Sequence, residues 1–155
     1  MKLNPLKFAA LTLAVCAYAN AAADPTCSVA ASGVAFGNYD PLANTNADSS
    51  GSVSVTCTGS TSVTYSIAAS AGTGTYSTRQ QMSGSHALDY NVFIDNSRTT
   101  VWGDGSQGTS LISGNMTATS TGTTQTSTVY GRVFSGQQTA RVGSYSDTLT
   151  VTVTY

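Results

Sequence analysis

The chain has 155 residues, of which only 8% are charged, and it contains no glutamate. Ordinary globular proteins carry about 25% charged residues, and here serine, threonine and glycine take their place. The six lysines and arginines form no basic patch, which argues against a surface for nucleic acid or anionic lipid. Disordered chains can share this composition, but they lack the alternating runs of Val, Ile, Tyr and Thr that recur here.

The first 23 residues have the pattern of a signal peptide. Lys2 and Lys7 give a short positive region, residues 8–19 are mostly apolar, and residues 20–23 are the small kind that signal peptidase accepts. We place the cleavage after Ala23, with cleavage after Ala21 as the alternative. The apolar run is too short to form a stable transmembrane anchor. The sequence therefore predicts export of residues 24–155 as one domain, without membrane insertion.

Cys16 offers a competing interpretation, in which the chain is a lipoprotein anchored through that residue. The preceding Leu13-Ala14-Val15 fits poorly, because the residue before a lipidated cysteine is usually Gly or Ala. Without residues 1–23 the chain keeps four arginines and seven aspartates, a formal charge of −3. It also keeps two cysteines, Cys27 and Cys57, which predict one disulfide in an oxidising compartment.

Strand patterns follow one another along the chain, and helix patterns are nearly absent. We predict a short strand at residues 33–39, a turn at residues 48–51, and a hairpin that joins residues 52–57 to residues 63–68 through Gly59 and Ser60. Further strands are predicted at residues 88–94 and 127–134, with reversals at residues 95–97 and 102–105. About seven strands in one domain favour a β-sandwich.

The last eleven residues, 145–155, form the cleanest alternating run. They place Leu149, Val151, Val153 and Tyr155 on one face and a row of threonines on the other. An apolar strand at the end of the chain needs a neighbour, or it leaves an edge that is open for pairing.

An ordered series of segments covers essentially all of residues 24–155. It consists of Cys27 and Cys57 with residues 36–41 between them, Arg79 and Met82, and residues 88–95, 102–105, 129–132 and 143–155. This series resembles the spore coat protein U family, which includes the Csu-type subunits of archaic chaperone–usher pili.

The resemblance implies an incomplete immunoglobulin-like sandwich that lacks its final strand. A periplasmic pilus chaperone would fill the resulting groove first, and the N-terminal extension of a neighbouring pilus subunit would fill it afterwards. The outer-membrane usher is a further partner that the resemblance implies. Leu149, Val151, Val153 and Tyr155 would form one wall of the groove. In such a pilin the donor strand precedes the first cysteine, where this chain keeps only Asp24-Pro25-Thr26 after cleavage. We therefore expect the chain to accept a strand without forming homopolymers, and to occupy an end or accessory position.

Few residues suit catalysis, and we expect neither an enzyme nor a bound metal or cofactor. His86, the one histidine, follows a Ser-Gly-Ser stretch that is typical of a loop. Asp89 and Asp95 could act as a pair of carboxylates, although Asp95 begins a turn. Asp104, between two glycines, could hint at a calcium ligand, but an aspartate in such a place usually stabilises a turn. Trp102 is a candidate for surface or sugar contact, and packing over one end of the sandwich is the favoured alternative. A tip adhesin or glycan-binding module is thus the alternative to a structural subunit, on a pilus or a coat.

Overall fold

A computed structural model describes residues 24–155, so the predicted signal peptide and Cys16 lie outside the described residues. The described part contains eight strands and no helix. The strands are β1 (Thr26–Ser32), β2 (Ala47–Thr58), β3 (Ser62–Ala69), β4 (Arg79–Ser83), β5 (His86–Phe93), β6 (Ile112–Thr117), β7 (Thr123–Val133) and β8 (Val151–Thr154). The predicted all-β class is confirmed.

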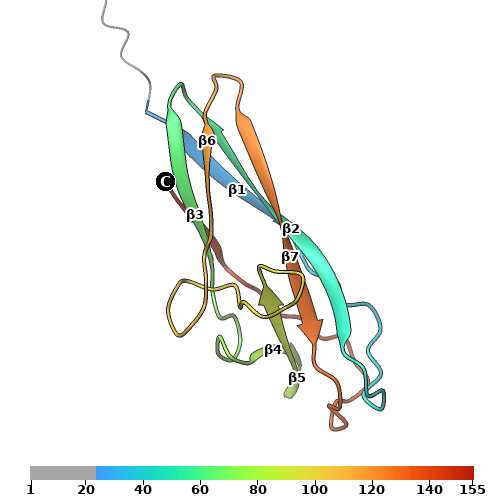
Figure 1. Cartoon of the computed structure of the whole chain (residues 1–155). Helices are drawn as coiled ribbons and strands as arrows, with labels where there is room; N and C mark the ends of the chain where they lie inside the picture. The colour runs from blue at the N-terminus through green and yellow to red at the C-terminus, as the bar shows by residue number, and fades with distance from the viewer. Residues whose placement is uncertain (1–23) are drawn as a thin grey trace, which may run out of the picture.

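The strands form two antiparallel sheets that pack face to face in an elongated sandwich (Figure 1). The larger sheet has the order β1-β2-β7-β5-β4, and the smaller one has the order β6-β3-β8. Every second residue is buried in β3 and in the C-terminal half of β2, so Val53, Val55 and Cys57 pack with the inner face of β3 in the core. The predicted immunoglobulin-like β-sandwich is confirmed.

The outer face of the large sheet explains why the chain is so rich in serine and threonine. Ser54 and Thr126 face each other across β2 and β7, with hydroxyl oxygens 2.7 Å apart, and Thr56 and Thr124 repeat this pair at 2.7 Å. β-Branched threonine suits a pleated strand, and cross-strand hydroxyl pairs satisfy polar groups without charge.

Two predicted local features are wrong. Residues 48–51 are part of β2 rather than a turn, since Asp48 lies opposite Arg132 of β7 and both Arg132 Nε and Nη2 donate to its carboxylate at 2.7 and 2.8 Å. Gly51 serves a close approach instead of a turn, because a Cβ there would lie 2.7 Å from the carbonyl oxygen of Ser32. The predicted hairpin is also wrong, because β2 and β3 belong to different sheets.

The predicted strand at residues 33–39 is likewise absent. This segment continues from β1 without a strand partner, although Val34, Phe36 and Tyr39 still turn toward the core. In contrast β1, β4 and β6 were not predicted, since each has only one or two strongly apolar residues in its run.

Trp102 lies in the core, in agreement with the favoured alternative of packing, and is not placed for the surface or sugar contact for which it was a candidate. Its side chain is 3% exposed, and its indole Nε1 donates to the carbonyl oxygen of Ile67 at 3.1 Å. Its own carbonyl oxygen accepts a 2.8 Å hydrogen bond from the fully buried Arg79, whose guanidinium also donates to Asn91 Oδ1 and to the carbonyl oxygen of Ser70. Trp102 and Arg79 therefore connect β3, β4, β5 and the segment around Trp102 through hydrogen bonds inside the protein.

Candidate strand-binding groove

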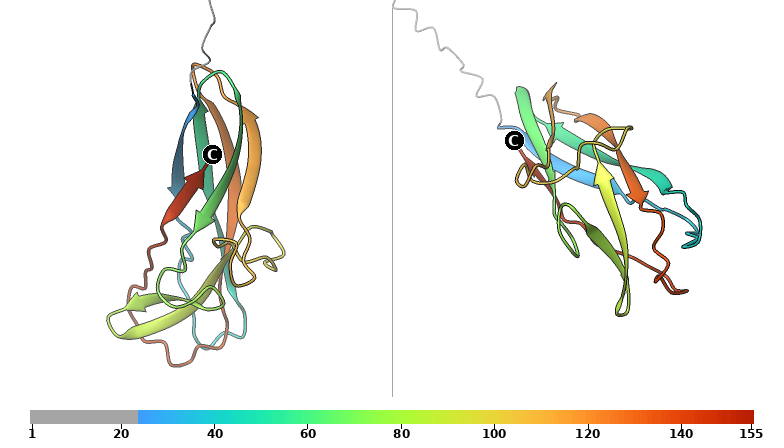
Figure 2. Two further views of the ribbon diagram at one scale, coloured as in Figure 1. Left: turned by 90° about the vertical axis from the view of Figure 1, so that its left-hand side faces the viewer. Right: turned by 60° about the horizontal axis from the view of Figure 1, so that its bottom comes forward.

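One side of the sandwich is bounded by two strands that each have a single neighbour. β1 pairs only with β2, and β8 pairs only with β3, so each strand is the edge of its sheet. The two edges lie near each other and run in opposite directions (Figure 2). The segment after β1, to residue 41, and the segment from residue 140 that leads into β8 lie together at the end of this side farthest from the C-terminus.

Half-buried apolar side chains line both of these segments and pack against the core. The first wall contains Cys27, Val29, Val34, Phe36 and Tyr39, and the second contains Ala140, Tyr145, Leu149, Val151 and Val153. We call the space between the two walls the groove. Of the four residues predicted to line it, Leu149, Val151 and Val153 share the inner face of the second wall. Tyr155, 53% exposed, lies at the open end of the chain.

The C-terminal run alternates between half-buried and exposed residues from residue 145 to residue 154, yet only Val151–Thr154 form a strand. Ser146 bridges to Met82 of the large sheet through two backbone hydrogen bonds of 2.8 and 3.2 Å. Ser70 then donates its backbone N–H to the carbonyl oxygen of Thr150 at 2.9 Å, beyond which β8 joins the small sheet. The run therefore connects the two sheets along the groove.

A pocket of about 490 Å³ lies at the end of the groove farthest from the C-terminus. We call it the end pocket. Its two sides are residues 36–41 of the first wall and residues 140–145 of the second, and Leu88 and Val133 belong to its lining from the large sheet. The groove thus ends in a space larger than one side chain.

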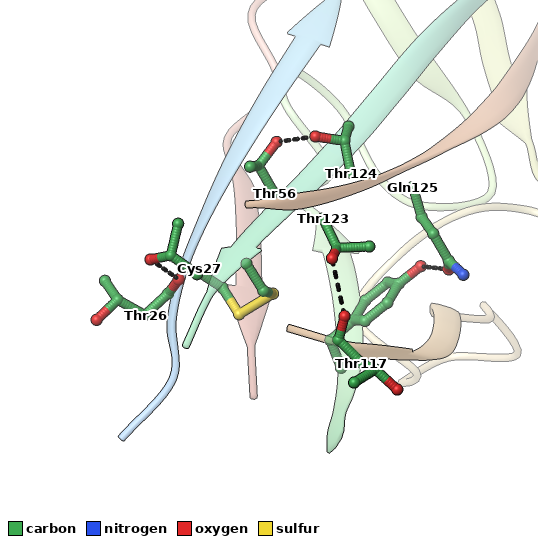
Figure 3. Close-up of a disulfide and its surroundings, with 10 residues drawn as sticks. Thr26, Cys27, Thr56, Thr117, Thr123, Thr124 and Gln125 are labelled. Atoms are coloured by element: carbon green, nitrogen blue, oxygen red, sulfur yellow. Dashed lines mark hydrogen bonds between the residues drawn. A yellow bond between two sulfur atoms is a disulfide. The ribbon is translucent and has the colours of Figure 1, made fainter. Parts of the chain in front are cut away.

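A disulfide fixes the first wall to the core (Figure 3). Cys27 of β1 and Cys57 of β2 are directly opposite each other in the strand register, and their sulfur atoms are bonded. Cys57 is fully buried, whereas Cys27 is half-buried in the groove. The bond therefore restrains an edge strand that has no neighbour on its other side.

Asp147 is the one charged residue between residues 142 and 155, and hydrogen bonds hold its carboxylate. It accepts from the hydroxyl of Tyr90 at 2.7 Å and from the backbone N–H of Thr73 at 3.1 Å. Burial raises the pKa of Tyr90 well above its usual range, and the hydrogen bond to Asp147 raises that pKa further. Arg141, which lines the end pocket, is a second charge beside the groove, and the apolar side chains of the two walls are neutral and suit an apolar strand.

The other candidate residues do not gather at a site. His86 is exposed at the start of β5, and Asp89 accepts a hydrogen bond from Gln80 at 3.0 Å. The Asp95 carboxylate caps its turn, where Ser97 and the backbone N–H groups of Thr99 and Thr100 lower its pKa. Asp104 similarly accepts from Ser106. Within residues 24–155, no three His, Cys, Asp or Glu side chains are placed to hold a metal ion.

The first wall beyond β1 and the end pocket were missed as parts of the site. By sequence, Phe36 and Tyr39 belong to a predicted strand and to the series that resembles the family, and nothing in the local pattern assigns Ala140 to a site. The two-residue spacing of Val34 and Phe36 is the signal that could have placed these two on a common face, whereas Tyr39, three residues further on, breaks this period. In the same described part of the chain, no helix has the length and apolar character needed to cross a membrane.

Comparison with known proteins gives a family and a fold. The model of the Spore Coat Protein U domain matches residues 12–152. No curated protein matches the chain. Among solved structures, the chain is similar to one in the chaperone–tip adhesion subunit pre-assembly complex from the archaic chaperone-usher Csu pili of Acinetobacter baumannii, with a TM-score of 0.59 and 23% identity. The likeness covers 84% of this chain but only 40% of that one.

Proposed function

Because the chain belongs to the spore coat protein U domain family, we propose that it is an exported structural subunit of an extracellular pilus or coat and that it accepts a β-strand from another protein. The observation that carries this proposal is the pair of edge strands, β1 and β8, with half-buried apolar residues between them. The Cα atoms of β1 and β8 approach to within 8 Å, which is less than two strand spacings of about 4.8 Å each. An inserted strand would therefore move the two edges apart and then pair with both through its backbone. Its alternate side chains would cover the apolar residues of both walls.

Burial of apolar side chains favours a filled groove. Complete burial of a Val or Leu side chain stabilises a protein by about 1.5–3 kcal/mol. Leu149, Val151 and Val153 are each only half-buried, so covering them contributes on the order of 3 kcal/mol. Pairing also satisfies the unpaired backbone groups of two edges, which are otherwise a hazard for aggregation.

We infer the partners from the half-buried apolar residues and the unpaired edges of the groove, which another protein would cover. A periplasmic chaperone would supply the first strand, an outer-membrane usher would receive the complex, and a neighbouring subunit would supply the final strand. In this role residues 1–23 are the export signal, and residues 24–155 are one domain that works outside the cytoplasm without catalysis. The disulfide between Cys27 and Cys57 is in keeping with an oxidising compartment.

Expression in a bacterial periplasm, with and without the chaperone from the same chaperone–usher locus, tests the proposal. With the chaperone, the chain should accumulate as a one-to-one complex that survives purification. Alone, it should aggregate or be degraded. A chain that accumulates alone as a stable monomer with cooperative unfolding would contradict strand acceptance.

A surface- or glycan-binding module, such as a tip adhesin, is the second candidate. It is favoured by the exposure of two large apolar residues near the end pocket, Leu42 at 74% and Val142 at 109%. Replacing both with serine should release the chaperone-bound protein from polystyrene or a glycan array if the chain is adhesive. Chaperone capture should be unchanged in the Leu42→Ser variant alone, because Leu42 lines neither the end pocket nor the inner face of β8.

A further inference from the structure

We propose that side chains of β7 close the free edge of β6, so that a further β-strand, including one from a second copy of this chain, adds only on the side of β1 and β8. This inference rests on the proposed strand acceptance and adds the edge from which a strand is excluded. The outermost strands of the two sheets are β1 and β4 in the larger sheet and β6 and β8 in the smaller one. Each outermost strand is a template for pairing unless something covers it.

The edge of β4 is covered by backbone from elsewhere in the chain. The N–H of Gln80 donates to the carbonyl oxygen of Thr73 at 2.9 Å, and Met82 exchanges two hydrogen bonds of 2.8 and 3.2 Å with Ser146. An antiparallel strand turns its backbone away from its partner at every second residue, and Gln80 and Met82 are two residues apart. A strand that added to β4 would first have to displace both of these segments.

The edge of β6 is covered by two side chains of β7 instead. The carbonyl oxygen of Thr117 accepts a 2.8 Å hydrogen bond from the hydroxyl of Thr123 (Figure 3). The carbonyl oxygen of Asn115 accepts a 3.2 Å hydrogen bond from the side-chain amide of Gln125. Asn115 and Thr117 are again two residues apart, so both carbonyls face away from β3. Two successive acceptors that an added strand would need are therefore already occupied.

A buried tyrosine holds Gln125 in this position. Tyr65 of β3 is 4% exposed, and its hydroxyl donates to Oε1 of Gln125 at 2.6 Å. Because Oε1 accepts from the tyrosine, the amide nitrogen is the group that turns to Asn115. Gly114 of β6 makes room for this contact, since a Cβ atom there would lie 2.6 Å from the hydroxyl oxygen of Tyr65. A core residue thus fixes the side chain that covers an exposed edge.

The side of β1 and β8 differs from the edge of β6 in what an added strand would bury. Half-buried apolar residues line the groove between β1 and β8. On β6, the residues that alternate with those facing the core are Ser113, Asn115 and Thr117, which are polar and exposed. Strand addition at the groove therefore covers apolar surface, whereas addition at β6 has to displace two hydrogen bonds first.

A variant without the cover tests the proposal. Thr123→Val and Gln125→Met remove both donors, and Tyr65→Phe removes the hydroxyl that would lose its acceptor. The control also carries Tyr65→Phe, but combines it with Thr124→Val and Thr126→Val, which add apolar groups to the outer face of β7 and leave the cover in place. Both variants are compared with the parent chain as one-to-one complexes with the chaperone, so that the groove side is occupied.

Sedimentation at several protein concentrations and hydrogen–deuterium exchange give the readouts. Complexes of the uncovered variant should pair with one another, with an association constant at least about tenfold above those of the control and the parent chain. In these pairs the backbone N–H groups of Asn115 and Thr117 should exchange at least about tenfold more slowly. Association no stronger than in the control, or pairs in which these two N–H groups gain no protection, would overturn the inference.

Failure of the proposed function gives a different result. If no chaperone complex forms and the parent chain is a stable monomer, strand acceptance at the groove is overturned, and the same three chains are compared without the chaperone. Uncovered chains that pair through β6 would then still support the closure of this edge by Thr123 and Gln125, and uncovered chains that stay monomeric would overturn that closure as well.

Discussion

The hydroxyl of Tyr90 donates a 2.7 Å hydrogen bond to Oδ2 of Asp147. Tyr90 lies in the core on β5 and is 4% exposed, whereas Asp147 belongs to the run that leads into β8. The bond therefore attaches the second wall of the groove to the inner face of the large sheet. The hydrogen bond lies in the part of the run between Ser146, which pairs with β4, and Val151, where β8 begins to pair with β3.

Removing this bond should loosen the second wall. Tyr90→Phe deletes the hydroxyl and leaves the Asp147 carboxylate with backbone donors only, so the free energy of unfolding should fall by about 1–2 kcal/mol. Urea titration followed by fluorescence measures the change. Tyr130→Phe is the matched control, because no hydrogen-bond partner of its hydroxyl occurs among residues 24–155, and that change should stay within about 0.5 kcal/mol. Equal losses in the two variants would refute this role for Tyr90.

A charge on the inner face of β8 should prevent strand capture. Val151→Asp places an unpaired carboxylate on a half-buried position that packs against the core, where an inserted strand would cover it. Co-purification with the chaperone should drop at least about tenfold, equivalent to 1.4 kcal/mol. Thr152→Asp puts the same charge on the exposed face of the same strand and should be captured normally. If both variants are captured alike, the inner face of β8 does not contact the chaperone's strand.

The disulfide should protect both cysteines of the exported protein from alkylation. Mass spectrometry without prior reduction should find neither Cys27 nor Cys57 modified, and reduction should expose both. Replacing both with serine should cost about 3–4 kcal/mol in the loop-entropy model for a sequence separation of 30 residues. Two labelled thiols in the unreduced protein would show that the bond does not form in the cell.

Asp48 should contribute stability that is lost in acid. The hydrogen bond from Arg132 lowers the pKa of Asp48 below its usual value, and the charge of Arg98 contributes further. A carboxylate whose pKa falls on folding stabilises the fold above its unfolded pKa, near 3.9, and loses this contribution as the pH falls through the folded value.

Asp48→Asn should therefore cost about 0.5–1 kcal/mol at neutral pH, a modest figure because the carboxylate is partly exposed. The difference from the parent chain should shrink as the pH is lowered to about 2. Arg132→Gln should produce the same loss, and the double variant should add little to it. A pH-independent difference would mean that the ion pair is not its source.

The sequence predicted the sandwich and the inner face of the last strand because both depend on a period of two. That period persists in the C-terminal run even where no strand pairs with it, so Leu149, Val151 and Val153 could be assigned to one face. Alternation does not reveal which sheet a strand joins. β2 and β3 alternate as a hairpin would, yet the turn between them crosses from one sheet to the other.

Contacts between distant residues explain the remaining errors. Residues 48–51 have turn composition, but the pairing of Asp48 with Arg132 and the approach of β1 to Gly51 hold them in β2. The end pocket depends on two segments about 100 residues apart, and no local pattern places Phe36 beside Tyr145. Trp102 illustrates the same dependence on distant contacts, because its burial and the hydrogen bond from its indole to the carbonyl oxygen of Ile67 follow only from the fold.

Hydrogen–deuterium exchange tests the central claim most directly. The chain is measured alone and with a strand of alternating Thr and Val that is fused after Tyr155 through a tight turn, so that it returns along β8. If the groove accepts a strand, alternate backbone amides of both β1 and β8 should exchange rapidly in the chain alone. The same amides should exchange at least about tenfold more slowly once the strand is present, while the amides that already join β1 to β2 and β8 to β3 should change less. Amides of both edges that are equally protected with and without the added strand would contradict the account, because the sandwich would then be complete by itself.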